Sequence, residues 1–294
     1  MTCLGRFHAE SHSKKDEYHE RLRSVNPRAS REIPEDWEQE TLVTLRALNV
    51  PYTTALQAEM RMAMQETLNP TGPFATVIHS DPCPDNVFDF PDRLLLIDFE
   101  FASVMSCLLD ATYPRMSFPS GWCAKRIPEE LIDAVEASYR NELKKRIPAA
   151  RDDRTYYEAY TQACAHHMLT KDMGLIPHIL EEDSIRGISS QRSRVISHLQ
   201  AFIAISEKHQ TLPALRSMAV QILHSLEDRW PNAKPLHLYP AFSGRISPIS
   251  WKSMTFGALP RNPMLDDSHI VRSPITWHEM RFLTEANKNK KSQI

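Results

Sequence analysis

Apolar side chains recur every three or four residues over most of the 294-residue chain, which is the spacing of an amphipathic helix. The pattern predicts helices over 34–48, 53–68, 127–147, 152–172, 190–207 and 213–229. Pro34 followed by two acidic residues is a typical helix start. The segment 127–147 begins with acids and ends with Lys and Arg, as the helix dipole favours. We therefore expect a mainly α-helical fold.

A short β region interrupts this helical pattern at residue 74. Residues 74–79 (FATVIH) are apolar and partly β-branched, and two further apolar runs follow at 87–90 and 93–99. A Pro-Asp pair separates these two runs and is typical of a turn. We predict a small β-hairpin made of the last two runs, entered through the loop 79–86, and no second β region elsewhere.

Proline interrupts the chain repeatedly beyond Trp230. Stretches such as RISPIS and ALPRNP show no regular period, and the last ten residues, EANKNKKSQI, are polar and charged. We expect one folded domain over 1–242 and an irregular extension over 243–294.

Charge and composition argue against several kinds of partner. The formal net charge is −2, whereas a nucleic-acid-binding protein normally carries a basic excess or stripe. No apolar run approaches the roughly 18 residues that span a bilayer, and the start of the chain is too polar for a secretory signal. The five cysteines are scattered without a C-x-x-C pair, which is typical of free thiols. We expect a cytoplasmic protein that binds neither nucleic acid nor membrane.

Glycine is scarce in this chain. There are only 7 glycines, and none of their spacings makes a Walker P-loop, a dinucleotide-binding fingerprint or a kinase glycine-rich loop. The sequence therefore indicates no glycine-rich backbone cradle for phosphate.

The β region carries the residues with the clearest chemistry. His79, Asp81 and Asn86 make the spacing H-x-D-x-x-x-x-N, and Asp98 follows the second hairpin strand. The catalytic loop of protein kinases has the same spacing, with a metal-binding aspartate after a nearby strand. Oxygen ligands gathered in this way suit Mg²⁺, which is a hard cation. The alternative is that the two aspartates are ordinary turn or cap residues.

Residues 79–100 resemble the motif of aminoglycoside phosphotransferases, choline kinases and their relatives; they read HSDPCPDNVFDFPDRLLLIDFE. That family typically has HGD-x-x-x-x-N followed by L-I-D-[FW]-E, and Glu100 stands where protein kinases have glycine. Two flanking segments agree. Residues 4–9 (LGRFHA) are similar to the family's L-G-x-x-H-A helix, and residues 109–111 (LDA) resemble its D-L-A.

The resemblance implies a fold, a reaction and a role for each residue. The fold is the mainly helical C-terminal lobe of a protein-kinase-like phosphotransferase, which transfers phosphate from ATP to a hydroxyl group of a small-molecule acceptor. Asp81 would orient or deprotonate that hydroxyl, and Asn86 and Asp98 would bind the Mg²⁺ that bridges the nucleotide phosphates. His79 would brace the loop by hydrogen bonds. Glu100 would either support the metal ligands or form a salt bridge.

The sequence departs from the family's pattern in two respects. Ser80 replaces the usual glycine, and Pro82 and Pro84 restrict the loop further. The family's N-terminal sheet, with its phosphate-covering loop and lysine, has no counterpart over 1–68, where the spacing predicts helices without a sheet. We expect the ATP-binding lobe to be absent and the isolated chain to have very weak or no kinase activity.

Two other functions are compatible with the sequence. If the motif survives only as an element of the fold, the chain is a binding module or an inactive pseudoenzyme. If Asp81 and Asp98 hold a metal directly, the chain is a metal-assisted hydrolase, although no histidine ligands cluster around 79–100.

Two further groups of residues are weaker candidates. Cys164, His166 and His167 lie on one predicted helix, but adjacent histidines point to different faces, which disfavours a metal site. The acidic run 181–183 suits either recognition of a cationic acceptor or an ordinary solvated turn.

Overall fold

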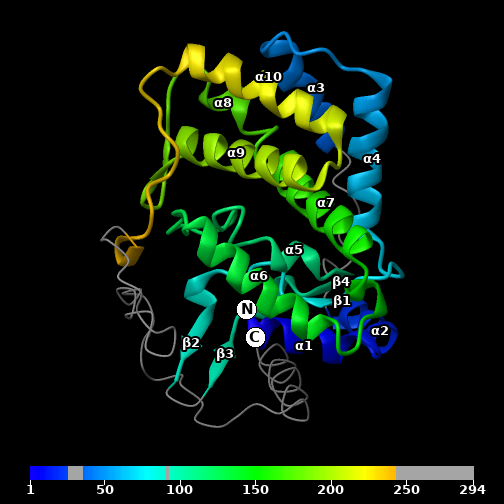
Figure 1. The fold of residues 1–294 in the computed structure, drawn as a ribbon. Coiled ribbons are helices and arrows are strands. Elements are labelled where there is room, and N and C mark those ends of the chain that lie inside the picture. The colour runs from blue at the N-terminus through cyan, green and yellow to red at the C-terminus, as the bar shows by residue number, and fades with distance from the viewer. Residues whose placement is uncertain (26–35, 91–92, 243–294) are drawn as a thin grey trace, which may run out of the picture. The chain divides into compact units, whose positions relative to one another are not determined.

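The computed structural model describes residues 1–25, 36–90 and 93–242, and this part of the protein is mainly helical, as predicted (Figure 1). The helices are α1 (Thr2–His12), α2 (Lys15–Val25), α3 (Trp37–Ala47), α4 (Thr54–Leu68), α5 (Leu108–Ala111), α6 (Glu129–Leu143), α7 (Asp153–Lys171), α8 (Ile176–Ile179), α9 (Gln191–His209) and α10 (Pro213–Arg229). None of these helices is long and apolar enough to cross a membrane. The predicted extension over 243–294 and the predicted helix start at Pro34 lie outside the described residues.

The longer helices lie where the apolar spacing predicts them, and local signals set several of their ends. The Thr53 hydroxyl accepts a hydrogen bond from the backbone N–H of Leu56 at the start of α4, at 3.1 Å. Ser190 caps α9 in the same way, and Pro213 stands in the first turn of α10. The described residues before β1 contain helices and no strand, which confirms the prediction for that part of the chain.

The strands form three small antiparallel pairs. They are β1 (Ala75–Ile78), β2 (Val87–Asp89), β3 (Leu94–Leu96), β4 (Ser103–Ser106), β5 (Ile185–Arg186) and β6 (Ser189–Ser190). The predicted hairpin is confirmed as β2–β3, in which Val87 lies opposite Leu96. β1 pairs with β4 and β5 pairs with β6.

The prediction that β structure is confined to 74–99 is therefore wrong. β4 lies after that region, and all four of its residues are buried, so it shows no alternation of apolar and polar positions. β5 and β6 have only two residues each, which is too short for any period to be visible.

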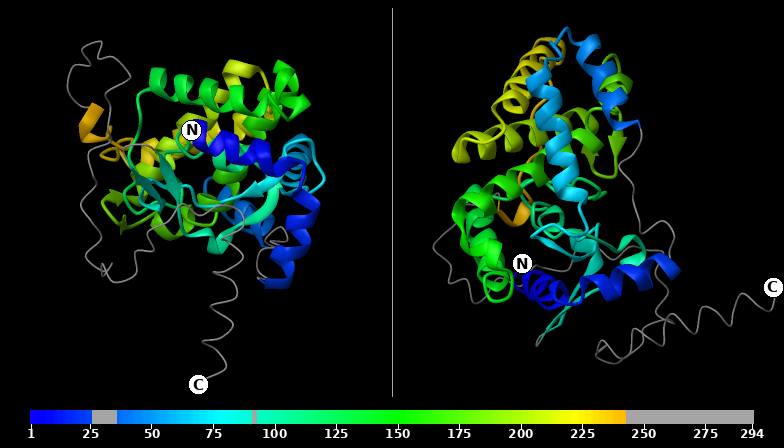
Figure 2. Two further views of the ribbon diagram at one scale, coloured as in Figure 1. Left: turned by 90° about the horizontal axis from the view of Figure 1, so that it is seen from below. Right: turned by 90° about the vertical axis from the view of Figure 1, so that its right-hand side faces the viewer.

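The core joins the helices to the β1–β4 pair. α4 packs against α7 and α10, and α9 packs against the same two helices (Figure 1). α1 packs against α6 and β1, as two further views show (Figure 2). Val43 of α3 and Met62 of α4 are apolar but 43% exposed, so these two side chains lie outside the core.

A glycine lets α1 approach α6 closely. A Cβ atom at Gly5 would lie 2.8 Å from the carbonyl oxygen of Tyr139 and 3.0 Å from Cβ of Glu142. Real side chains do not tolerate such a contact with backbone, so only glycine allows this crossing. One turn later, the close approach brings His8 against the Tyr139 hydroxyl, at 2.7 Å.

A buried arginine fixes the segment that follows α5. The Arg115 side chain is only 2% exposed, and it forms ion pairs with three acidic residues of α6. They are Glu129 at 2.6 Å, Asp133 at 3.0 Å and Glu136 at 2.6 Å. Because a buried guanidinium is costly without partners, these contacts hold residues 113–117 against α6.

Candidate functional site

His79 begins the loop that follows β1, and its side chain is fully buried. Its Nε2 lies 2.6 Å from the carbonyl oxygen of Ile97, and its Nδ1 lies 3.3 Å from the backbone nitrogen of Asp81. A carbonyl oxygen only accepts hydrogen bonds, so Nε2 carries the ring hydrogen and Nδ1 accepts from Asp81. These two bonds tie the start of the loop to the residue before Asp98. The expectation that His79 braces the loop is confirmed.

Asp110 anchors the same loop from the protein interior. Its carboxylate is fully buried and accepts the backbone N–H of His79 at 2.6 Å and that of Ser80 at 2.9 Å. The ring of His8 supplies a third contact, with Nε2 at 3.2 Å from Oδ2. A buried carboxylate costs free energy unless it is paired, and these three partners satisfy it.

The contacts of His8 and Asp110 unite the three segments that carry the family resemblance. His8 comes from residues 4–9, Asp110 from residues 109–111, and both bonded N–H groups from the loop at 79–86. His8 is held in turn by Tyr139, whose hydroxyl donates to the carbonyl oxygen of Cys107 at 3.2 Å. Segments far apart in the sequence therefore converge on one buried carboxylate.

Asp81 and Asn86 are in direct contact. The Asn86 side chain lies 2.9 Å from the carbonyl oxygen of Asp81 and 3.3 Å from its Oδ2. Because a carbonyl oxygen cannot donate, the atom that faces it must be the amide nitrogen Nδ2. The amide oxygen Oδ1, the atom able to bind a metal ion, therefore points along the other branch of the side chain.

Ser120 is a site residue that the sequence did not reveal. Its hydroxyl donates to Oδ1 of Asp81 and lies 3.3 Å from Sγ of Cys83. Tyr113, 3.4 Å from the same hydroxyl, donates to the carbonyl oxygen of Ser80 at 2.6 Å. Both carboxylate oxygens of Asp81 therefore have fixed partners, Ser120 on one side and Asn86 on the other.

Asp98 stands beside Asn86 at the base of the β2–β3 hairpin. The backbone N–H of Ile97 donates to the carbonyl oxygen of Asn86 at 3.0 Å, which continues the hairpin register and places Asp98 one residue further on. The Asp98 side chain is exposed, and no residue in the described part of the chain forms a hydrogen bond or ion pair with it. The structure thus joins Asp81 to Asn86 and puts Asp98 next to that pair along the hairpin.

Two residues of the site have left-handed backbone conformations that normally favour glycine. Ser80 has φ of +68° and Asp98 has φ of +64°. For a residue with a Cβ atom this conformation costs roughly 1–2 kcal/mol. The motif that this segment resembles has glycine where Ser80 stands, and glycine adopts this conformation without that cost. Five other non-glycine residues among those described also have positive φ, namely Asn49, Ser117, Phe118, Gln210 and Leu212, so this conformation alone does not mark the site.

Asn86 and Asp98 offer oxygen atoms of the kind that bind Mg²⁺. Asn86 Oδ1 and the Asp98 carboxylate are hard donors of the kind that Mg²⁺ takes. Within the described residues, no three His, Cys, Asp or Glu side chains gather as a metal site. Mg²⁺ in nucleotide enzymes needs only one or two carboxylates, because water and phosphate oxygens complete its shell. Glu100 lies exposed in the short turn Phe99–Phe101, and its role stays a prediction.

The weaker candidates have structural partners. Cys164 is buried in the core, His166 hydrogen-bonds to Thr67 at 2.9 Å, and Nε2 of His167 donates to the carbonyl oxygen of Leu109 at 2.9 Å. These three side chains do not converge on a metal site.

The acidic run at 181–183 also contributes to local structure. Asp183 accepts hydrogen bonds from the backbone of Ser184 at 2.8 Å and from the hydroxyl of Ser190 at 2.5 Å. Its carboxylate therefore closes the turn that leads into α9.

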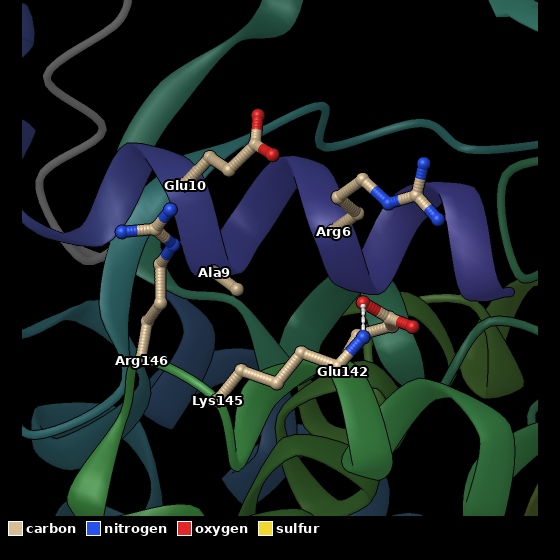
Figure 3. Close-up of a pocket in the computed structure, with 6 residues that line it drawn as sticks. All are labelled: Arg6, Ala9, Glu10, Glu142, Lys145 and Arg146. Carbon is tan, nitrogen blue, oxygen red and sulfur yellow. Dashed lines mark hydrogen bonds and ion pairs between the residues drawn. The ribbon is translucent and has the colours of Figure 1, made fainter.

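Two surface grooves lie outside the segment 79–100. One, of about 310 Å³, lies between α1 and α6 (Figure 3). It is lined by Arg6, Ala9, Glu10, Glu142, Lys145 and Arg146, with an ion pair of 2.6 Å between Lys145 and Glu142. The other, of about 250 Å³, lies between α4, α7 and the β1–β4 pair. Neither groove is lined by Asp81, Asn86 or Asp98.

Comparison with known proteins adds no family. No family model matches the chain, and no curated protein does either.

Proposed function

We propose that the chain carries the metal- and acceptor-binding part of a kinase-like phosphotransferase. In this proposal phosphate passes from ATP, with Mg²⁺, to a hydroxyl group of a small molecule. The observation that carries the proposal is the convergence on Asp110, where the segments at 4–9, 79–86 and 109–111 meet through hydrogen bonds. An accidental match to a short motif would not be expected to bring its two distant flanks into contact with it.

The proposed roles follow from the contacts of each side chain. Asp81, held by Ser120 and Asn86, would orient or deprotonate the acceptor hydroxyl. Asn86 Oδ1 and the Asp98 carboxylate would hold the magnesium ion. When bound, that ion would offset the negative charge of the phosphates.

The same observation supports a proposal about the fold. We infer that the mainly helical part over 1–242 is the C-terminal lobe of a protein-kinase-like fold. The order of elements supports this: a helix, a strand, the H-x-D-x-x-x-x-N loop, a hairpin and then the metal-binding aspartate. A nucleotide-dependent reaction also agrees with the cytoplasmic location expected from the sequence.

Nucleotide binding is the first test of this proposal. Isothermal titration of the purified chain with ATP should show binding that requires Mg²⁺ and is lost in Asp98→Asn. Asp89→Asn is the matched control, because Asp89 is exposed on β2 and belongs to the same hairpin. Equal binding by the wild type and Asp98→Asn would contradict the proposed metal site.

Turnover is the second test. With ATP, Mg²⁺ and a panel of aminoglycosides, choline and amino sugars, we expect slow transfer, well below the roughly 1–100 per second of typical kinases. The physical reason is that the described helices before β1 offer no sheet or glycine-rich loop to cover the phosphates. Any transfer should fall steeply to a small residual rate in Asp81→Asn and persist in Asp89→Asn.

A binding role without turnover is the second candidate. The same lack of a phosphate-covering element among the described residues favours it. Magnesium-dependent nucleotide binding with no transfer to any hydroxyl compound of the panel would select this function.

A further inference from the structure

Five consecutive carbonyl groups, those of residues 120–124, each accept a hydrogen bond from a distant part of the chain. The donors are Arg186 Nη2 to Ser120 at 2.9 Å, Arg194 Nη2 to Gly121, Ile188 N to Trp122 at 3.1 Å, Tyr239 Oη to Cys123 at 3.0 Å and Ser189 Oγ to Ala124 at 2.6 Å. Residues 120–124 form no helix or strand, so donors outside the segment satisfy these carbonyls. Their positions therefore fix its conformation.

Four of these five donors come from the β5–β6 hairpin and the start of α9. The segment that they hold begins with Ser120, whose hydroxyl donates to Oδ1 of Asp81. We propose that Ser120 is the positioning residue for the Asp81 carboxylate, and that the β5–β6 hairpin holds Ser120 in place. This inference rests on the proposed function, because it assigns Ser120 its role through the proposed catalytic group.

The turn of the hairpin fits against the segment so closely that it requires glycine. Gly187 has φ of +62°, and a Cβ atom there would lie 1.9 Å from the carbonyl oxygen of Trp122. Any side chain at this position would push Trp122 away. The Trp122 indole N–H also donates to Asp85 at 2.9 Å, so the displacement would reach the loop that contains Asp81.

Arg194 supports the segment from the protein interior. Its side chain is 2% exposed, and one of its guanidinium nitrogens, Nη2, donates to the carbonyl oxygen of Gly121. A buried guanidinium that loses a partner is costly, so this contact resists displacement of the segment. Arg186 approaches from the exposed side, and its bond to Ser120 is the only one of the five made to the positioning residue itself.

The accessibility of the Cys83 thiol shows whether residues 120–121 keep their position, and it can be measured without phosphate transfer. Cys83 is 1% exposed and its sulfur lies 3.3 Å from the Ser120 hydroxyl, and a Cβ atom at Gly121 would lie 3.2 Å from that sulfur. Cys3 is the one exposed cysteine in the described residues, whereas Cys83, Cys107, Cys123 and Cys164 are buried. Movement of residues 120–121 should therefore expose the Cys83 thiol.

Thiol labelling tests the hairpin's part in the proposal. In a Cys3→Ser background, Gly187→Ala should speed maleimide labelling of Cys83 at least about 10-fold, as followed by peptide mass spectrometry. Gly72→Ala is the control, because a Cβ atom there makes only ordinary contacts of 3.4 Å or more. Unchanged protection of Cys83 in a folded Gly187→Ala protein would overturn the role of the hairpin. If that variant does not fold, Arg186→Met should give a smaller increase in labelling, and no increase would overturn the role equally.

Kinetics test the part of Ser120. Ser120→Ala should lower kcat by on the order of 10²-fold with little change in KM for ATP, and Ser120→Thr, which keeps the hydroxyl, should restore most of the loss. In an Asp81→Asn background, Ser120→Ala should have no further effect, because Ser120 acts through Asp81. Equal losses in both backgrounds, or failure of threonine to rescue, would overturn the assignment.

Absence of turnover would be a different result. If the wild type transfers no phosphate to any acceptor, the proposed transfer reaction fails. A crystal structure of Ser120→Ala then decides the positioning role, since an unmoved Asp81 carboxylate would overturn it. Labelling of Cys83 still decides the role of the hairpin.

Discussion

The carboxylate of Asp110 accepts the backbone N–H of His79 at 2.6 Å, although 31 positions separate the two residues in the sequence. His79 opens the loop with the proposed catalytic aspartate, and Asp110 is fully buried beneath it. The shape of the loop therefore depends on Asp110, a residue that is not exposed to solvent.

Asp110→Asn should destabilise the protein strongly. The amide keeps the shape of the side chain but turns one acceptor into a donor, which then faces a backbone N–H or the His8 ring. We expect the free energy of unfolding to fall by about 2–4 kcal/mol, measured by urea titration. Asp16→Asn, at a side chain that is 87% exposed, should change it by less than about 0.5 kcal/mol. Equal stability of Asp110→Asn and the wild type would disprove the anchoring role.

Glycine should be better tolerated than alanine at position 80. Both substitutions remove the 3.3 Å contact between the Ser80 and Ser103 hydroxyls, but only glycine relieves the left-handed backbone strain. Ser80→Gly should therefore be more stable than Ser80→Ala by about 1 kcal/mol in urea unfolding. Ser103→Ala measures the loss of the hydroxyl contact alone. Equal stability of the glycine and alanine variants would show that the backbone carries no such strain.

The stability of the protein should fall on mild acidification because of His167. Burial lowers the pKa of its imidazole to about 4, against about 6.5 for a histidine in an unfolded chain. The unfolded state therefore takes up a proton first as the pH falls, so stability is complete above about pH 6.5 and declines towards pH 4. This single group should cost about 2 kcal/mol between pH 7.5 and pH 5.

His167→Gln isolates this contribution. The glutamine amide can still donate to the carbonyl oxygen of Leu109, but it does not titrate. Urea unfolding of both proteins at the two pH values should show a smaller loss of stability in the variant. Identical losses would mean that His167 is not held neutral by its burial.

Gly5→Ala should weaken the packing of α1 on α6. The new methyl group would lie 2.8 Å from the Tyr139 carbonyl oxygen. This oxygen belongs to the backbone, so no side-chain rotation can relieve the clash. We expect a loss of about 1–3 kcal/mol in the free energy of unfolding. Gly72→Ala is the matched control and should be nearly neutral, since its nearest neighbour lies at 3.4 Å. Similar losses at both positions would argue against a special requirement at Gly5.

Much of the secondary structure could be predicted, because local chemistry decides it. The bounds of α10 coincide with the predicted ones, with proline in the first turn and regular apolar spacing. The hairpin β2–β3 was likewise visible from two apolar runs around a turn pair. β4 could not be predicted, because its partner β1 lies far from it in the sequence. β5 and β6 are adjacent in the sequence, but with two residues each they show no period.

The candidate site also combines residues that the sequence predicted with residues that it did not. The spacing of Asp81, Asn86 and Asp98 is local and was visible in the sequence. Asp110 left a signal as a lone charged residue in the apolar run LLDA, since a buried charge needs partners. Ser120 left none, because its contact with Asp81 spans 39 positions and its segment has no regular period.

The contacts of His8 also bear on how the molecule folds. His8 meets Asp110 and Tyr139 across 102 and 131 positions, and contacts with such separations tend to form late, after local helices. Substitutions at His8 should therefore leave the folding rate nearly unchanged and speed unfolding, as stopped-flow measurements would show. The loop at 79–80 then gains its full anchor only in the last stage of folding, so a partly folded chain would have its helices but no organised site.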